Sequence, residues 1–203
     1  PTLLSRWPHA IKQLQSTTAR LEETQQLLND LAAIDFQDLD ERAERYGYSI
    51  DYHRCALLSA GRIANLMRYW CQQKGLMRPN RNQLLQIQTQ FFGAGVHLSS
   101  ALVAWGACEC RLFNNRFYLM PSLASFSAAT RQITVGEDHK VNLGEAGELV
   151  FNDVMIKTQN ISIRWRQGGE RCRPIDRQHS QTVKKLLQEH HLETWLRDRV
   201  PLV

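Results

Sequence analysis

Positively charged side chains gather near the carboxyl end of the chain. Between Arg164 and Arg199 the sequence holds nine Lys or Arg residues against five Asp or Glu residues, a net charge of +4 where the whole chain has +5. Guanidinium forks and ammonium groups placed around a turn and a helix start are suited to binding phosphate groups. The candidate phosphate-binding residues in this window are Arg171, Arg173, Arg177, Lys184, Lys185, Arg197 and Arg199.

A second set of polar side chains lies on a predicted helix in the first half of the chain. Arg62, Asn65 and Arg68 follow one another at intervals of three residues, so they share one helix face. Arg78 and Arg81 bracket the start of the next predicted helix and are candidates to join these three residues in a second phosphate-binding surface. A polar row opposite an apolar row is also typical of any surface helix, so an ordinary solvent-exposed helix face stays open as the alternative interpretation.

The sequence contains no recognisable catalytic or metal-binding constellation. No motif supplies a nucleophile with a base and an orienting group, and no P-loop is present, so we predict no catalytic residue. The acids Asp35, Asp38, Asp40 and Glu41 lack the ligand spacing and the glycine of a calcium loop, which favours a solvated acidic turn. Cys108-Glu-Cys110 lacks a second cysteine pair, so we expect two small residues on one strand face and no metal.

The composition is that of a globular chain from a reducing compartment. The 203 residues are 43% apolar and 22% charged, and no apolar run approaches the ~20 residues that span a bilayer. No signal peptide is recognisable, and five irregularly spaced cysteines favour a cytoplasmic protein over a disulfide framework. The chain begins without Met and ends on an apolar run that resembles an interrupted strand, so we expect part of a longer protein.

Helical periodicity is the main signal before residue 93. Apolar residues at intervals of three, four and seven predict an amphipathic helix over about 8–33, which the acidic stretch ends. A second helix is predicted over 59–74 with Gly75 as its C-terminal stop. Asn80 is the expected N-cap of a third helix.

A β-hairpin is predicted to close this helical part. Small and bulky residues alternate over 102–113, Asn114-Asn115 is a tight-turn pair, and 116–120 returns as the second strand. Small and polar residues then predict a linker. The sequence thus predicts three parts, which are a helical domain at 1–122, a linker at 123–135 and a second domain at 136–203.

The second domain is predicted to be small and mixed, which makes the fold class α+β. Gly168-Gly169 forms a turn, and Ser180 is the expected N-cap of a helix that ends near His191. A final strand begins at Val200 and is truncated by the chain end. The other strand candidates are 132–135, 148–156 and 160–166.

Three motifs near the carboxyl end resemble one family in their order and spacing. They are Gly168-Gly-Glu-Arg-Cys-Arg173, Lys184-Lys-Leu-Leu-Gln-Glu189 and Trp195-Leu-Arg-Asp-Arg-Val-Pro-Leu202, and they resemble the C-terminal domain of bacterial tRNA(Ile)-lysidine synthetase. Segment 1–9 resembles the stretch that leaves that enzyme's catalytic domain. A second set of residues resembles the helical substrate-binding domain of that enzyme. These residues are Arg62, Asn65, Arg68, Trp70, Pro79-Asn80, Trp105-Gly106 and Tyr118. The resemblance spans nearly the whole chain and is weakest over 121–160.

The resemblance implies an ATP-dependent ligase as the parent protein. That family adenylates the wobble cytidine of an isoleucine tRNA with the anticodon CAU and then joins lysine to it. Its site for ATP and Mg²⁺ uses a Ser-Gly-Gly-x-Asp-Ser loop in an N-terminal catalytic domain, and this sequence has no such loop. The resemblance therefore implies the tRNA-gripping part of the ligase, with tRNA and the catalytic domain as partners, no cofactor of its own and no membrane.

Two points of the resemblance stay open. The C-terminal cations are implied to hold the acceptor stem, and the helical set at Arg62 to Arg81 is implied to hold the D-stem or the anticodon stem. Family members are monomers or homodimers, so the sequence does not fix the oligomeric state. His179-Ser-Gln-Thr stands where many relatives have more Gly or basic character, and the family's final hairpin is missing after Val203.

A competing hypothesis comes from a different functional class. The same basic surface suits a non-catalytic protein-interaction module that docks an acidic partner or a catalytic domain. Charge reversal at Arg173, Lys184 and Lys185 separates the two hypotheses. If the surface recognises RNA, tRNA binding drops while the fold stays intact, and if the surface docks a protein, tRNA binding barely changes.

Overall fold

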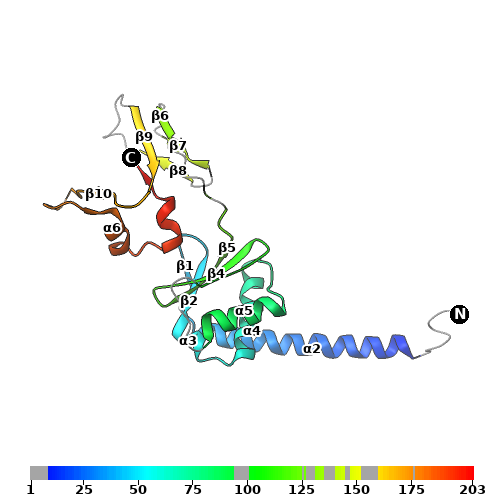
Figure 1. The fold of residues 1–203 in the computed structure, drawn as a ribbon. Helices are drawn as coiled ribbons and strands as arrows, with labels where there is room; N and C mark the ends of the chain where they lie inside the picture. The colour runs from blue at the N-terminus through cyan, green and yellow to red at the C-terminus, as the bar shows by residue number, and fades with distance from the viewer. Residues whose placement is uncertain are drawn as a thin grey trace. The chain divides into compact units, whose positions relative to one another are not determined.

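The computed structural model divides the chain into two compact units, residues 1–122 (unit 1) and 123–203 (unit 2). The described residues are 9–93, 101–124, 126, 131–134, 140–144, 147–151, 160–175 and 177–203. Helices dominate unit 1, strands dominate unit 2, and the α+β fold class is confirmed (Figure 1). No helix in the described part of the chain is long and apolar enough to cross a bilayer.

Local capping residues set the helix boundaries of unit 1. In α4 (Ala60–Gln73) the Ser59 side chain accepts a hydrogen bond from the backbone of Arg62. In α5 (Arg81–Phe92) Asn80 and Gln83 form a reciprocal capping box. Gly75 follows α4 with a φ of 65°, a left-handed conformation that favours glycine at a helix end. The predicted second and third helices and their end signals are therefore confirmed.

The first helix, α2 (Ala10–Gln37), is longer than the sequence predicts. We expected it to end at the acidic stretch, but it continues through Asp35 and Phe36, and Asp35 is buried. The expectation was wrong because α2 gains a packing partner, α4, over this last part. Figure 1 shows the amino-terminal part of α2 projecting beyond α4 and α5 as a rod.

A five-stranded antiparallel sheet completes unit 1, with the order β1-β2-β5-β4-β3. The expected hairpin is present as β4 (Cys108–Phe113) and β5 (Arg116–Pro121). Asn114 and Asn115 join these strands with φ values of 47° and 59°, the left-handed pair that a tight hairpin turn requires. Segment 102–113 is not one strand, because a turn at Gly106 and Ala107 separates β3 (Leu102–Trp105) from β4.

Three elements between residues 42 and 56 were not predicted. They are β1 (Arg42–Ala43), β2 (Tyr48–Asp51) and α3 (Tyr52–Ala56). Their partners are distant in sequence, since β2 pairs with β5 over the register Tyr48↔Leu119 to Asp51↔Arg116. Helices α4 and α5 lie on one face of the sheet (Figure 1). Trp70, Phe91 and Phe117, all fully buried, form the centre of the core there.

Unit 2 consists of short strands around a small core. The sheet order is β12-β9-β6, with β6 (Arg131–Thr134), β9 (Asn160–Trp165) and β12 (Pro201–Leu202) all antiparallel. Two further pairs join β7 (Lys140–Asn142) to β8 (Glu148–Val150) and β10 (Arg171–Cys172) to β11 (Gln181–Thr182). The predicted strands at 160–166 and from Val200 are present. The predicted strands at 132–135 and 148–156 correspond to β6 and β8 in their described parts, while 135 and 152–156 lie outside the described residues.

Three further strands of unit 2, β7, β10 and β11, and the 3₁₀ helix η3 (Thr194–Arg199) were not predicted. Helix α6 (Val183–Glu189) begins later than expected. Its N-cap is Thr182, which accepts a hydrogen bond from the backbone N–H of Lys185, and not Ser180. The Ser180 hydroxyl accepts a hydrogen bond from Arg171 instead, so the expected cap is used to hold an arginine.

Candidate nucleic-acid interface

Three of the candidate arginines lie on or beside the loop that joins β10 to β11. The Arg171 guanidinium donates to the hydroxyl of Ser180 at 3.2 Å and to its carbonyl oxygen at 2.9 Å. Arg173 Nε donates to the carbonyl oxygen of Arg177 at 3.2 Å, and Arg177 Nη1 lies 2.9 Å from Glu189 Oε2. All three arginines are exposed, so the loop is tied together by guanidinium groups that still face solvent.

Lys184 and Lys185 lie in the first turn of α6 and are exposed. Within the described residues, neither ammonium group has a carboxylate within ion-pair distance. A Lys side chain near neutral pH carries a full positive charge. Neither lysine therefore has to leave a described carboxylate before it binds an anionic ligand.

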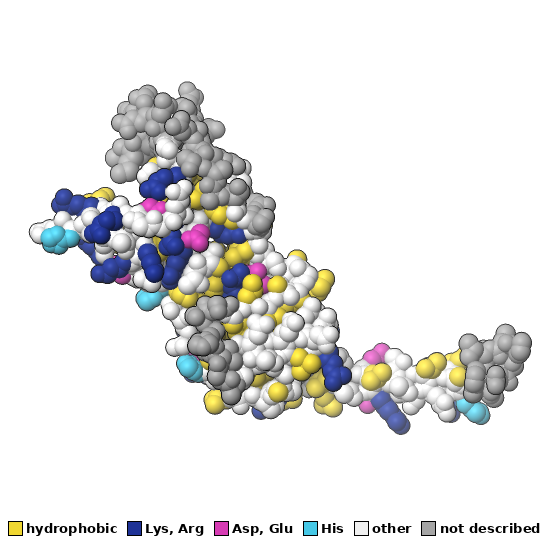
Figure 2. Space-filling view, viewed as in Figure 1, with side chains coloured by type: hydrophobic (Ala, Val, Ile, Leu, Met, Phe, Trp, Pro, Cys, Tyr) yellow, Lys and Arg dark blue, Asp and Glu magenta, His cyan; other side chains and the backbone are white. Residues whose placement is uncertain are grey.

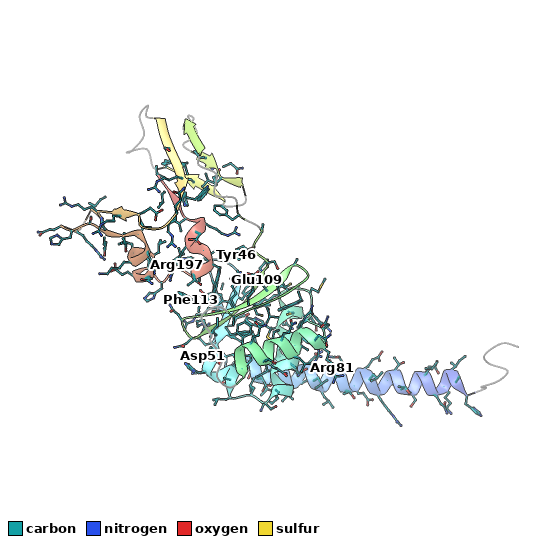
Figure 3. All side chains as sticks on the ribbon, in the orientation of Figure 1. Tyr46, Asp51, Arg81, Glu109, Phe113 and Arg197 are labelled. Carbon is teal, nitrogen blue, oxygen red and sulfur yellow. The ribbon has the colours of Figure 1, made fainter. Side chains whose placement is uncertain are left out.

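Arg197 and Arg199 lie on η3 and are only half-exposed. Arg197 Nε donates to the carbonyl oxygen of Leu192 at 3.0 Å, and Arg199 donates to the carbonyl oxygen of Ala124 and lies 5.2 Å from the centre of the Phe126 ring. Asp198, which stands between them in the sequence, pairs with Arg166 at 3.1 Å. Figure 3 marks Arg197 on η3.

Unit 2 thus brings five of its seven predicted cations onto one short stretch of structure. These are the three arginines around the β10–β11 loop and the two lysines of α6, and Figure 2 shows Lys and Arg side chains gathering over these two elements. We call this set, Arg171, Arg173, Arg177, Lys184 and Lys185, the basic surface. Arg164 on β9 was not predicted, although its alternation with the buried Trp165 in the sequence marks it as exposed.

The polar row of α4 is used largely inside unit 1. Arg62 Nε donates to Asp35 Oδ2 at 3.0 Å, its Nη2 donates to Asp35 Oδ1, and the Asp35 side chain is fully buried. Asn65 Nδ2 donates to the carbonyl oxygen of Leu28 at 2.6 Å. Both contacts fasten α4 to α2. The hydrogen bonds that Asp35 accepts from Arg62 raise the pKa of the Arg62 guanidinium, which therefore stays charged.

The other three candidates of unit 1 face solvent. Arg68 and Arg81 are exposed, and neither makes an ion pair or side-chain hydrogen bond to another described residue. Arg78 donates to the side-chain oxygen of Gln72. Figure 3 marks Arg81 at the start of α5. The structure therefore divides the five candidates into two that hold helices together and three that remain on the surface.

The acidic stretch 35–41 is not a solvated turn as expected. Beyond Asp35, Glu41 accepts hydrogen bonds from Trp70 Nε1 at 2.6 Å and from Lys74 Nζ at 2.8 Å. Asp40 pairs with Arg42 and with Arg116 Nη1 at 2.9 Å. The pKa of Asp40 is lowered, first by the hydrogen bond from Arg42. These acids are structural partners of basic and indole side chains.

The described residues offer no metal site, and two of the buried thiols are held in the protonated form. No group of three His, Cys, Asp or Glu side chains in this part of the chain could hold a metal ion. Cys108 and Cys110 are buried on β4, as expected for one strand face. Burial raises the pKa of Cys55 and of Cys71 to about 12, so these thiols stay protonated and are poor nucleophiles.

A two-unit α+β chain with a clustered basic surface and no catalytic constellation among its described residues has the features of a substrate-recognition module. Two family models match it, "TilS substrate binding domain" over residues 56–118 and "TilS substrate C-terminal domain" over residues 161–203. The first match covers α4, α5, β3, β4 and the start of β5, and the second covers β9 to β12 with the basic surface.

Curated relatives named tRNA(Ile)-lysidine synthase match the whole chain. The relative from Coxiella burnetii is 29% identical over 210 residues, and those from Serratia proteamaculans and Edwardsiella ictaluri are 29% identical over 209 and 212 residues. In each case 100% of this chain is matched, against 45% or 46% of the relative. The chain belongs to the tRNA(Ile)-lysidine synthase family, and it spans about half the length of the curated relatives it matches.

Proposed function

We propose that this chain is the tRNA-recognition part of a tRNA(Ile)-lysidine synthetase. The single observation that carries the proposal is the basic surface of unit 2, which lies within the segment matched by the C-terminal substrate domain of that family. Folded RNA presents dense phosphates, and proteins recognise its A-form helices mainly through backbone and 2′-hydroxyl contacts. Exposed Arg and Lys side chains on β10, α6 and the loop between them supply the matching charges.

The proposal extends to the reaction of the parent protein. In it, an N-terminal catalytic domain uses ATP and Mg²⁺ to adenylate the wobble cytidine of an isoleucine tRNA with the anticodon CAU, and lysine then replaces the adenylate. The present chain holds the tRNA and contributes no reacting group. The proposed setting is the bacterial cytoplasm, where tRNA is modified, and a homodimer of the parent protein is compatible with this role.

Within the proposal the candidate residues differ in support. The basic surface comes first because its cations are exposed and two of them, Lys184 and Lys185, have no carboxylate partner among the described residues. Arg197 and Arg199 follow, since their guanidiniums also hold backbone carbonyls. In unit 1, Arg68, Arg78 and Arg81 are proposed contacts with a second tRNA stem. Arg62 and Asn65 have the least support, because they fasten α4 to α2.

A charge-reversal experiment tests this function. The variant Arg173→Glu, Lys184→Glu, Lys185→Glu removes three phosphate contacts, so we expect tRNA binding to weaken on the order of 10- to 100-fold and the slope of log affinity against log salt to fall by about 2–3. Binding is measured by fluorescence anisotropy with a labelled tRNA transcript at several salt concentrations. Circular dichroism checks that the variant folds.

A matched control carries the same change of net charge elsewhere. The variant Lys12→Glu, Arg20→Glu, Lys140→Glu reverses three exposed cations on α2 and β7. If both variants lose the same affinity, binding follows net charge alone and the proposed surface is wrong. If the first variant binds tRNA as the wild type does, the protein-interaction module is the better reading of the basic surface.

A further inference from the structure

A carboxylate fills the glycine turn that joins β9 to β10. Gly168 and Gly169 have φ values of 99° and 84°, which L side chains rarely adopt. Both oxygens of the Glu170 carboxylate accept a hydrogen bond from the backbone N–H of Gly168 at 3.0 Å, and Oε1 also accepts one from Gln167. Successive backbone N–H groups in such a turn form a concave site for an anion. The chain's own carboxylate occupies it here.

Glu170 is held in this turn as a charged group. Arg164 Nη1 on β9 lies 3.6 Å from Glu170 Oε1, and the Glu170 side chain is only 8% exposed while that of Arg164 is 47% exposed. The backbone hydrogen bond from Gln167 is the largest cause that lowers the pKa of Glu170. The carboxylate is therefore ionised at neutral pH and is anchored from two sides.

Glu170 is connected to both elements that carry the basic surface, β10 and α6. Arg171 follows Glu170 directly and opens β10, where it pairs with Thr182 of β11. The Glu170 carbonyl oxygen accepts a hydrogen bond at 2.9 Å from the backbone N–H of Val183, the first residue of α6. The next two residues of α6 are the exposed lysines. The position of Glu170 thus fixes both where β10 leaves the turn and where α6 begins.

We propose that Glu170 is a positioning residue for RNA binding: its carboxylate locks the 167–170 turn, so that the cations of β10 and α6 meet the RNA as one surface. This inference rests on the proposed function and assigns Glu170 no contact with the RNA. Simple electrostatics points the other way, because an acid beside a phosphate-binding surface should weaken RNA binding. A loss of affinity on removal of this negative charge therefore has to come from geometry.

The test compares two substitutions that remove the same charge. Glu170→Gln keeps the size of the side chain, and Glu148→Gln is its control on β8 of the same unit, where the carboxylate lies 3.9 Å from Lys140. We expect Glu148→Gln to bind a tRNA transcript as tightly as the wild type or slightly more tightly. Glu170→Gln is expected to bind about 5- to 10-fold more weakly, with a salt slope smaller by about 1 because at least one phosphate contact is lost.

The outcomes distinguish a failure of the positioning role of Glu170 from a failure of the proposed tRNA-recognition function. Equal affinity and equal salt slope for the two variants would overturn the positioning role of Glu170 while the proposed function stands. Absence of any salt-sensitive tRNA binding by the wild-type chain would overturn the proposed function and this inference together.

A second variant and a pH titration cover the case in which Glu170→Gln fails to fold. Gly169→Ala strains the same turn through its φ of 84° while leaving every charge in place, and Gly61→Ala on α4 is its control. The positioning role requires weaker tRNA binding by Gly169→Ala alone. In the wild type, the NMR shift of the Gly168 amide should titrate with a midpoint below 4.5, the ordinary glutamate value, and a midpoint at or above that value would contradict the anchoring.

Discussion

The Asp35 carboxylate is fully buried and accepts two hydrogen bonds from Arg62, whose side chain is 44% exposed. The partners are 27 residues apart, on different helices. The sequence alone places Asp35 among four acids on a turn, because nothing local indicates that α4 will pack over it. The same packing explains why Arg62, a reasonable surface candidate by helical spacing, is an internal partner.

Removing this buried charge should destabilise unit 1. Asp35→Asn leaves the guanidinium of Arg62 without its anionic acceptor, so we expect the free energy of unfolding to fall by on the order of 1–3 kcal/mol. The exposed Asp38→Asn is the control and should change it by less than about 0.5 kcal/mol. Urea denaturation followed by tryptophan fluorescence measures both. Equal effects of the two substitutions would mean that the Asp35–Arg62 pair contributes nothing specific.

The candidate site was predictable as a set of charges and not as a set of contacts. Counting Lys and Arg located the basic surface, since charge clustering is written directly in the sequence. The hydrogen bonds from Arg171 to Ser180 and from Arg173 to Arg177 depend on the path of the β10–β11 loop, which no periodicity encodes. Glu170 was missed for the same reason, although an acid directly after two glycines is a usable signal.

At the scale of single elements, prediction succeeded where the determinants are local. Gly75 and Asn80 act within one turn of their helices, so their residue types suffice to predict where α4 ends and α5 begins. The strands β1 and β2 were missed because they are two and four residues long and are stabilised by β5, far along the chain. Ser180 and Thr182 are both plausible N-caps, and only tertiary structure decides between them.

Two asparagines at the start of α5 allow a sharp test of the capping box. Asn80→Ala removes the side chain that accepts from Gln83, and we expect a loss of about 1 kcal/mol in the free energy of unfolding. Asn82→Ala, two residues later and exposed inside the helix, should instead stabilise by roughly half a kcal/mol because alanine has the higher helix propensity. Thermal unfolding of both variants would show shifts of opposite sign. Shifts of the same sign would contradict the cap.

At the scale of the whole molecule, each unit has its own core. The core of unit 1 includes four buried cysteines, Cys55, Cys71, Cys108 and Cys110, and the smaller core of unit 2 is formed by Val141, Leu143, Ile163 and Trp165. The chain divides after residue 122. We propose that the two units correspond to the two predicted domains, with 123–135 as the connection.

The distribution of thiols makes the unfolding of unit 1 measurable by itself. Cys172 is exposed on β10 and should react promptly with an aromatic disulfide reagent, whereas the four thiols of unit 1 should react only when that unit opens. We expect one fast thiol in the native chain and five in denaturant, with the slow rates following the stability of unit 1. Asp35→Asn should accelerate the slow thiols and leave Cys172 unchanged. Prompt reaction of two or more thiols in the native chain would show that the core is open.

Arg171 and Arg173 are already hydrogen-bonded to backbone carbonyl oxygens of their own loop. A long side chain that moves freely loses conformational entropy when it docks, and one restrained during folding loses much less. The loop therefore presents its arginine side chains in restrained positions, whereas the two neighbouring lysine side chains keep more conformational freedom. This combination lets the basic surface select the shape of a folded polyanion through the restrained arginines, while the lysines tolerate small variations in that shape.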